Sequence, residues 1–240
     1  MNHELDLSLI IACYNETENL IDSVREIVET LDQTRYSYEF IFIDDCSQDN
    51  TREVIDLVIS QYPDKSFRKI FHEQNKGRGG TITEGILDAR GQVVGYIDID
   101  LETHARYIPS CIAAVKGGCD VAIARRHHHI QLHSIYRYIL STGYRLLVKW
   151  SFDCPPMDTE AGFKFFNREN ILPVLAEVDN QHWFWDTEIM IRSYLTGLKI
   201  TQIPTLFIRR FDKYSTVNPI TDSIEYLVQL YRFKKRIKQE

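Results

Sequence analysis

Three acidic side chains stand at alternate positions in the segment 96–102, which reads Tyr–Ile–Asp–Ile–Asp–Leu–Glu. If this segment is extended, Asp98, Asp100 and Glu102 point to the same side and repel one another unless a cation or hydrogen-bond donors lie between them. Mg²⁺ and Mn²⁺ suit carboxylate oxygens, and Mg²⁺ is typically held by one or two carboxylates together with substrate phosphates. The spacing therefore predicts a divalent-metal site, with these three ligands, that binds a nucleoside diphosphate. A polar strand end that only caps the next helix is the alternative interpretation.

Two further segments have residues that suit a nucleotide. Asp44 and Asp45 end an apolar run, and a carboxylate at such a strand end can accept hydrogen bonds from a base or a ribose. Ser47 or Asp49, in the turn that follows, can instead cap the next helix. The segment 75–80 reads Asn–Lys–Gly–Arg–Gly–Gly, and its glycines allow close backbone approach where a helix start favours an anion. It is not a P-loop, because the Lys–Ser/Thr ending is missing.

The elements that must position these residues alternate along the first half of the chain. Apolar runs at 7–12, 39–43, 69–72, 93–98 and 120–124 predict strands, and the segments between them have apolar residues at helical spacing. Such a pattern is typical of an α/β doubly wound, mostly parallel sheet flanked by helices. Ligands bind outside the carboxyl ends of such strands. The polar clusters at 14–16, 44–45 and 98–100 should therefore converge on one edge of the sheet.

The second half shows no pattern of an independent core, so the whole chain, 1–240, is predicted to be one domain. It divides into a nucleotide-binding half at 7–126, a second half at 127–220 and a basic amphipathic helix at 221–240. Within the second half we expect helices at 132–150 and 185–196, a segment with two prolines at 153–166, and strands near 199–208. The three consecutive histidines, His127 to His129, are predicted to lie in a solvated loop.

The C-terminal helix has two apolar stripes, one at positions 224, 227, 228 and 231 and the other at 226, 230, 233 and 237. Basic residues gather at its end. It could lie on a membrane surface, bind a membrane-protein partner or dock on its own body.

Composition excludes several classes of protein. The 240 residues include 34 acidic and 28 basic ones, a net charge of −6, so we expect no nucleic-acid partner. No run of about 18 apolar residues and no signal-peptide pattern is present, which favours a cytoplasmic protein, with peripheral attachment to a membrane as an option. The five cysteines lack close pairs and are predicted to be reduced, mostly buried thiols.

Taken together and in order, the motifs resemble those of the family 2 glycosyltransferases of GT-A fold. The family pattern has strands that end in A-Y-N-E and D-D-x-S-x-D, an N-x-G-x-G loop and a D-x-D strand. It is matched by Ala12 to Glu16, with one extra residue, and by Asp44 to Asp49, Asn75 to Gly79 and Asp98 to Asp100.

Within that family the chain is most similar to the polyprenyl-phosphate branch, which is dolichol-phosphate mannose synthase-like. The branch motifs D-A-D-L-Q, S-R, R-x-x-x-S, D-x-x-x-G-F-K and F-D-x-E are matched by Asp98 to Glu102, Ala124–Arg125, Arg137 to Ser141, Asp158 to Lys164, and Trp185 to Glu188. Two departures are Glu102, where the family has glutamine, and the histidine triplet, where it has glycines and a tryptophan.

The resemblance implies a metal-dependent inverting glycosyltransferase that uses Mg²⁺ or Mn²⁺. It would move a hexose from a nucleotide-diphosphate sugar, a GDP- or UDP-hexose, to a polyprenyl (dolichyl or undecaprenyl) phosphate lipid at the cytoplasmic membrane face. Asp100 would act in catalysis with the metal. The expected nucleotide-sugar-binding residues are Tyr14, Glu16, Asp44, Asp45, Lys76, Asp98 and Lys213. The expected acceptor-phosphate residues are Arg125, Arg137, Ser141 and Arg210.

The acceptor is the open question. A phosphate acceptor is already anionic and needs only cations, whereas a hydroxyl acceptor needs a catalytic base. Several Arg and Lys residues follow the metal strand, which favours the phosphate. The alternative is a saccharide hydroxyl in cell-surface polysaccharide assembly, with Asp158 or Asp186 as the catalytic base. A non-catalytic nucleotide-sugar binding module is a third hypothesis, disfavoured by the intact acid cluster.

Overall fold

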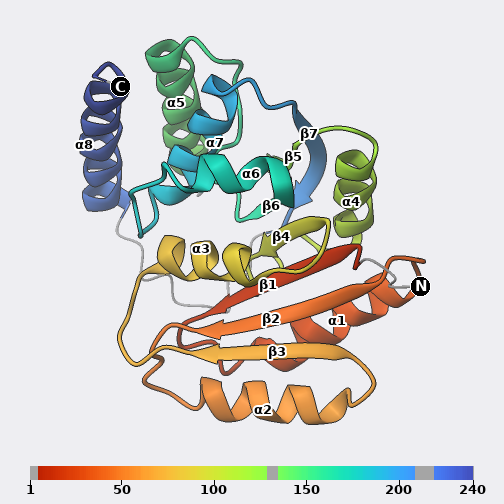
Figure 1. Ribbon diagram of the computed structural model, residues 1–240. Helices are drawn as coiled ribbons and strands as arrows, with labels where there is room; N and C mark the ends of the chain where they lie inside the picture. Colours follow the sequence, from red (N-terminus) through yellow and green to blue (C-terminus); the bar gives the residue numbers. More distant parts are fainter. Residues whose placement is uncertain (1–4, 129–134, 209–218, 240) are drawn as a thin grey trace.

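The strands of the described residues form one seven-stranded sheet (Figure 1). The computed structural model describes residues 5–128, 135–208 and 219–239. The strand order is β3-β2-β1-β4-β6-β5-β7. The strands are β1 (Leu7–Cys13), β2 (Tyr38–Asp44), β3 (Ser66–Phe71), β4 (Val93–Ile97), β5 (Val121–His128), β6 (Phe163–Asn167) and β7 (Ile200–Phe207).

Most neighbouring strands are parallel. β1 pairs in parallel with β2 and β4, β2 with β3, and β5 with β7, whereas β6 is antiparallel to both of its neighbours, β4 and β5. The predicted mostly parallel α/β sheet is therefore confirmed. Strand β6 overlaps the end of the segment 153–166, for which the sequence predicts no strand. A run of five residues is too short to show a period.

Helices cover both faces of the sheet. They are α1 (Leu20–Asp32), α2 (Thr51–Gln61), α3 (Arg78–Asp88), α4 (Ile108–Lys116), α5 (Ile135–Phe152), α6 (Arg168–Leu175), α7 (Trp185–Leu195) and α8 (Pro219–Ile237), with a short 3₁₀ turn, η1 (Ala105–Tyr107), before α4. Along β1, Leu9 and Ile11 belong to the core beneath α1, α2 and α4, whereas Ile10 belongs to the core with α3, α5 and α7. This alternation explains why the central strands are largely apolar. Ser8 of β1 and Glu39 of β2 are buried exceptions, and the Ser8 hydroxyl donates to Glu39 at 2.6 Å.

The histidine triplet differs from its prediction. β5 continues to His128, and His127 and His128 pair with Leu206 and Phe207 of β7, so these two histidines are in a strand rather than a loop. Pairing with β7 extends β5 beyond its apolar part. The side chain of His127 is exposed, and His129 lies outside the described residues. The five cysteines are free, and Cys13, Cys111 and Cys154 are buried, as predicted.

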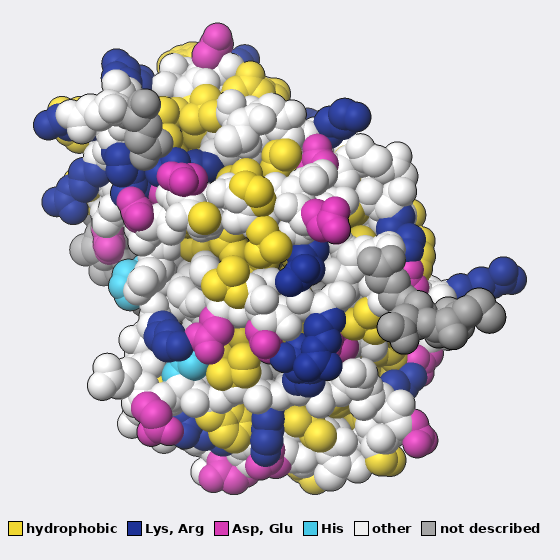
Figure 2. All heavy atoms as spheres, in the orientation of Figure 1, with side chains coloured by type: hydrophobic (Ala, Val, Ile, Leu, Met, Phe, Trp, Pro, Cys, Tyr) yellow, Lys and Arg dark blue, Asp and Glu magenta, His cyan; other side chains and the backbone are white. Residues whose placement is uncertain are grey.

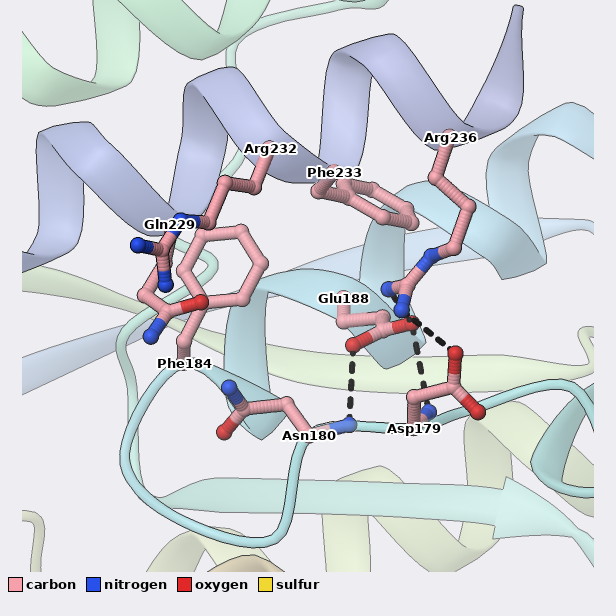
Figure 3. Close-up of a pocket in the computed structure, with 8 residues that line it drawn as sticks. All are labelled: Asp179, Asn180, Phe184, Glu188, Gln229, Arg232, Phe233 and Arg236. Atoms are coloured by element: carbon pink, nitrogen blue, oxygen red, sulfur yellow. Dashed lines mark hydrogen bonds and ion pairs between the residues drawn. The ribbon is translucent and has the colours of Figure 1, made fainter. Parts of the chain in front are cut away.

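The two apolar stripes of α8 have different surroundings. Leu230 and Phe233 of one stripe are buried against the body, and Arg236 donates to Glu188 at 2.6 Å and to Asp179 (Figure 3). The other stripe is exposed, with Tyr231 72% accessible. No helix in the described ranges is long and apolar enough to cross a bilayer.

Candidate active site

The carboxyl ends of β2, β1 and β4 lie next to one another, and each leads into one of the motif segments. A non-glycine residue with positive φ follows each end: Cys46 (φ 65°), Asn15 (φ 56°) and Leu101 (φ 52°). Such left-handed backbone costs energy and is concentrated at functional sites. The chain thus turns sharply at three adjacent strand ends on the edge where the sequence predicted a ligand.

The loops that follow β1 and β2 are joined by hydrogen bonds. The Asn15 amide donates to the Ser47 hydroxyl at 2.9 Å, the Gln48 amide donates to the Asn15 side chain at 2.8 Å, and the Glu16 amide donates to Thr51 at 2.9 Å. The predicted nucleotide residues Tyr14 and Glu16 are thereby held beside the Asp44 turn. Tyr14 is half exposed, so its ring is available to a ligand.

The Asp44 carboxylate is fully buried at this junction. Its Oδ2 accepts hydrogen bonds from Nε of Arg52 at 2.7 Å and from the Ser47 amide at 3.2 Å. Its Oδ1 has no hydrogen-bond partner among the described residues. Because a buried polar atom without a partner is costly, this oxygen is a candidate acceptor for a donor group of a ligand.

Asp45 faces the glycine-rich loop rather than the solvent. Its carboxylate accepts the amide hydrogens of Lys76 at 2.7 Å and of Gly77 at 2.9 Å. Gly77 has φ +82°, and a Cβ there would overlap the ring of His182. The Lys76 side chain reaches out to an ion pair with Glu84. Asp45 therefore shapes the loop, whereas Lys76 lies at the surface.

The two acids of the D-x-D motif and the nearby Glu102 line one pocket. Asp98, Asp100 and Glu102 surround it together with Thr103, Arg126, Gly162 and Phe207. The Asp98 amide donates to the Gly162 carbonyl at 2.9 Å, and a Cβ on residue 162 would overlap the Asp98 carboxylate. The amide of Ile208 donates to the Glu102 carbonyl at 2.9 Å, which ties the motif to the end of β7.

Within the described residues, no three His, Cys, Asp or Glu side chains are grouped so as to hold a metal ion by themselves. The three predicted ligands, Asp98, Asp100 and Glu102, line one pocket but do not form such a group.

Arg78, at the start of α3, joins the glycine-rich loop to the D-x-D motif. Its Nη2 lies 2.5 Å from Oδ1 of Asp98, and its Nη1 donates to Asp186. Its guanidinium lies over the rings of Tyr96 and Trp183, at 5.4 and 5.3 Å from their centroids. No pattern in the sequence points to this arginine, because its partners are distant along the chain.

Asp186 is the centre of a buried network. Besides Arg78, it accepts hydrogen bonds from the fully buried Lys164 and from the Tyr96 hydroxyl. Burial by itself would raise the pKa of Asp186, but the charges of Arg78 and Lys164 outweigh burial and hold it below the ordinary value. Burial also lowers the pKa of Lys164.

Asp158 has a comparable arrangement with Arg126. Nε and Nη2 of Arg126 lie 2.9 and 2.8 Å from the two Asp158 oxygens, a bidentate pair. Burial would raise the pKa of Asp158, yet the Arg126 charge holds it below its usual range. Asp158 and Asp186, the two predicted candidates for a base, are both held in ion pairs.

The predicted acceptor residues are only partly brought together. Arg125 of β5 is exposed, whereas its neighbour Arg126 lines the pocket, because successive side chains of a strand point to opposite faces. The Ser141 hydroxyl lies 3.5 Å from Oε2 of Glu160. The side chains of Arg137, Arg210 and Lys213 lie outside the described part of the chain.

Comparison with known proteins finds a glycosyltransferase family and relatives that are named as glycosyltransferases. The family model described as "Glycosyl transferase family 2" matches residues 8–172. The chain is 29% identical over 205 residues to glycosyltransferase AglD of Haloferax volcanii, covering 83% of this chain and 32% of that protein. It is 26% identical over 244 residues to a dolichyl-phosphate beta-glucosyltransferase of Dictyostelium discoideum, covering 96% and 74%. With a dolichol-phosphate mannosyltransferase of Pyrococcus furiosus it shares 29% identity over 238 residues, covering 96% and 64%.

The chain thus spans about a third of AglD and between about two thirds and three quarters of the other two relatives. Among solved structures, glucosyl-3-phosphoglycerate synthase from Mycobacterium tuberculosis, crystallised with Mg²⁺ and uridine diphosphate, superposes with a TM-score of 0.70 at 15% identity, covering 96% of this chain and 80% of that one. A second structure of that enzyme, with Mn²⁺, UDP-glucose and phosphoglyceric acid, gives a TM-score of 0.72 at 15% identity, with the same coverage. These structures share the fold. Since the family model covers more than half of the residues, the chain belongs to glycosyl transferase family 2, and the superposed structures show that it has the GT-A fold.

Proposed function

We propose that this enzyme transfers a hexose from a nucleoside-diphosphate sugar to a polyprenyl phosphate, with inversion, at the cytoplasmic face of a membrane. The observation that carries the proposal is the pocket that Asp98, Asp100 and Glu102 line together with Arg126. The carboxylates suit a metal-bound diphosphate, and a guanidinium suits a phosphate. The relatives named for dolichyl-phosphate or dolichol-phosphate transfer support the same acceptor.

On the donor side, Asp98 and Asp100 would hold Mg²⁺ or Mn²⁺, with Glu102 as a direct or water-mediated ligand. The bound ion neutralises charge on the leaving diphosphate. The free Oδ1 of Asp44 would accept a hydrogen bond from the nucleotide, and the exposed ring of Tyr14 would pack against it. The two cited structures of the synthase contain Mg²⁺ with uridine diphosphate or Mn²⁺ with UDP-glucose, which makes a uridine nucleotide the first donor to test.

On the acceptor side, the ion pairs favour a phosphate over a hydroxyl. A hydroxyl acceptor needs a base, and Asp158 or Asp186 would have to leave Arg126, or Arg78 and Lys164, to act as one. A phosphate monoester is largely ionised at cell pH and can attack without losing a proton to the enzyme. Arg126 would hold it, with Arg125, Arg137, Ser141 and Arg210 as further predicted contacts.

A lipid acceptor also requires contact with a membrane. The exposed stripe of α8 and the exposed Leu146, Leu147 and Trp150 of α5 would form that contact, and α5 packs beside α8 (Figure 1). Figure 2 shows basic side chains gathered at the upper left, where α8 lies. Apolar side chains bordered by Lys and Arg suit an anionic bilayer surface.

The test is transfer of labelled hexose from UDP- and GDP-hexoses, with Mn²⁺, to a polyprenyl phosphate and to the matching free polyprenol. We expect transfer to the phosphate and none to the alcohol. Comparable transfer to the alcohol or to a saccharide would contradict the phosphate acceptor and support the hydroxyl alternative. Hydrolysis of the donor without transfer to the phosphate, the alcohol or a saccharide would support the donor site and contradict the proposed acceptor.

A further inference from the structure

His72 lies between two carboxylates behind the glycine-rich loop. It follows β3 and is 3% exposed. Its Nδ1 lies 2.8 Å from Oδ1 of Asp45, and its Nε2 lies 3.1 Å from Oε2 of Glu84 on α3. Both ring nitrogens therefore face an acidic oxygen at hydrogen-bond distance.

The hydrogen bonds fix the protons on this ring. An ionised carboxylate can only accept, and Asp45 already accepts the Lys76 and Gly77 amide hydrogens. Glu84 also accepts from the Lys76 side chain. Burial would raise the pKa of Glu84, but the hydrogen bond and the charge of Lys76 work against burial and favour the ionised carboxylate. Two acceptors on opposite sides require two N–H donors on the imidazole.

We propose that His72 is a buried imidazolium whose charge positions the glycine-rich loop. The chain of contacts runs from His72 to the Asp45 carboxylate, then to the amides of Lys76 and Gly77, and so to Arg78. Arg78 in turn contacts Asp98 of the D-x-D motif. His72 touches neither substrate nor metal in this scheme and is a positioning residue. The inference rests on the proposed function only in assigning the loop to a nucleotide donor.

The groups that face His72 come from each neighbouring element. Asp45 faces it from the end of β2, Glu84 from α3 and Lys76 through Glu84, while Arg52 of α2 donates to the His72 carbonyl. A neutral ring would present a lone pair to one of the two carboxylates, and that hydrogen bond would be lost. The position of the loop therefore depends on the second N–H of the ring.

Two measurements on the full chain without ligands test this. Nitrogen-15 spectra of labelled histidine report the protonation of each ring nitrogen, and the His72 signals are assigned by their loss in His72→Gln. Amide hydrogen exchange, corrected for the intrinsic effect of pH, reports the Lys76 and Gly77 hydrogen bonds. We expect two protonated nitrogens at neutral pH and exchange about tenfold faster in His72→Gln, which loses a charged hydrogen bond.

The variant Glu84→Gln keeps the side-chain shape and removes one of the two charges. It should lower the fraction of His72 rings with two protonated nitrogens at neutral pH and speed the exchange of the Lys76 and Gly77 amides. The matched control, Glu53→Gln on the exposed face of α2, should move neither. If His72→Gln does not fold, the exchange of the Lys76 and Gly77 amides in Glu84→Gln still decides.

A single protonated nitrogen in the wild type at neutral pH, or unchanged protonation and exchange profiles in Glu84→Gln, would overturn the inference. Neither readout involves a sugar donor or acceptor. A failure of the proposed transfer reaction is therefore distinguishable from a failure of this positioning role.

Discussion

Arg78 and Asp98 form an ion pair, with 2.5 Å between Nη2 and Oδ1, that joins the glycine-rich loop to the D-x-D motif. The other guanidinium nitrogen of Arg78 bonds Asp186, so one cation lies between the predicted metal-site acid and a buried acid. A metal ion at Asp98 would share that carboxylate with Arg78. The loop and the metal site are therefore electrostatically coupled.

The first prediction follows from this coupling. Without nucleotide, Arg78→Gln should bind Mn²⁺ about three- to tenfold more tightly, because the competing cation at Asp98 is gone. Its melting temperature should fall, because Asp186 loses one of two buried cationic partners. Electron paramagnetic resonance of free Mn²⁺ and thermal unfolding measure the two effects. Arg25→Gln, which removes an exposed ion pair on α1, is the control and should change neither. Unchanged Mn²⁺ affinity in Arg78→Gln would show that the ion binds away from Asp98.

The second prediction concerns the metal. Asp100→Asn should lower transfer at least a hundredfold, since removal of one preorganised charge at a reacting diphosphate costs about that much. The fold should persist, because Asp100 is only partly buried. Excess EDTA should abolish wild-type transfer, and added Mn²⁺ should restore it. Full activity in EDTA would rule out the metal-dependent mechanism.

Much of this architecture is readable in the sequence, because local patterns encode it. The strand before Asp44 and the one before Asp98 are largely apolar, and that pattern predicts a parallel sheet and a shared edge for their terminal acids. The two stripes of α8 are likewise visible in their spacing, and the burial of Leu230 and exposure of Tyr231 confirm that they face different surroundings.

The unpredicted parts depend on contacts between distant residues. Arg78 meets Asp186 across 108 positions, and Arg126 meets Asp158 only because β5 and the segment before β6 are brought together. No periodicity reports such pairs. The roles of Asp45 and Arg125 show the same limit, since the sequence cannot tell which of two adjacent residues turns toward the pocket.

That ambiguity sets the third prediction. Arg125→Gln should change the KM for polyprenyl phosphate less than the double variant Arg126→Gln/Asp158→Asn, because Arg126 lines the pocket. The double variant is used because removing Arg126 alone would leave Asp158 buried and unpaired, at a cost of about 3–5 kcal/mol. Steady-state kinetics with varied acceptor measure the effect, which should be at least tenfold for the double variant. A larger effect of Arg125→Gln would instead support Arg125 as the residue that binds the acceptor phosphate.

The fourth prediction is a stability that depends on pH. Burial raises the pKa of Glu160 above its ordinary 4.5, despite the nearby Arg126 and Arg145, so its charged form is disfavoured in the folded state. Glu160→Gln should therefore be more stable than the wild type at neutral pH, by about 1 kcal/mol or 2–4 °C in melting temperature. The difference should vanish below about pH 4.5, where Glu160 is protonated in both states. Denaturant unfolding at several pH values checks this, and a gain that persists in acid would contradict it.

The last prediction concerns the exposed stripe of α8. Leu227→Ser/Tyr231→Ser should reduce sedimentation with anionic vesicles at least tenfold, because both side chains are exposed and apolar contact adds to the attraction of the basic helix end for lipid phosphates. The fold should be unaffected, since Leu230 and Phe233 still dock the helix. The matched control is Leu57→Ser, which removes a comparably exposed leucine from α2, at the opposite end of the molecule (Figure 1). Wild-type binding should weaken with salt and disappear on truncation after Pro219. Equal loss of vesicle binding in Leu57→Ser would indicate nonspecific adhesion. Absence of wild-type binding at low salt would rule out α8 as a lipid contact. The helix would then bind a membrane-protein partner or only dock on the body of the protein.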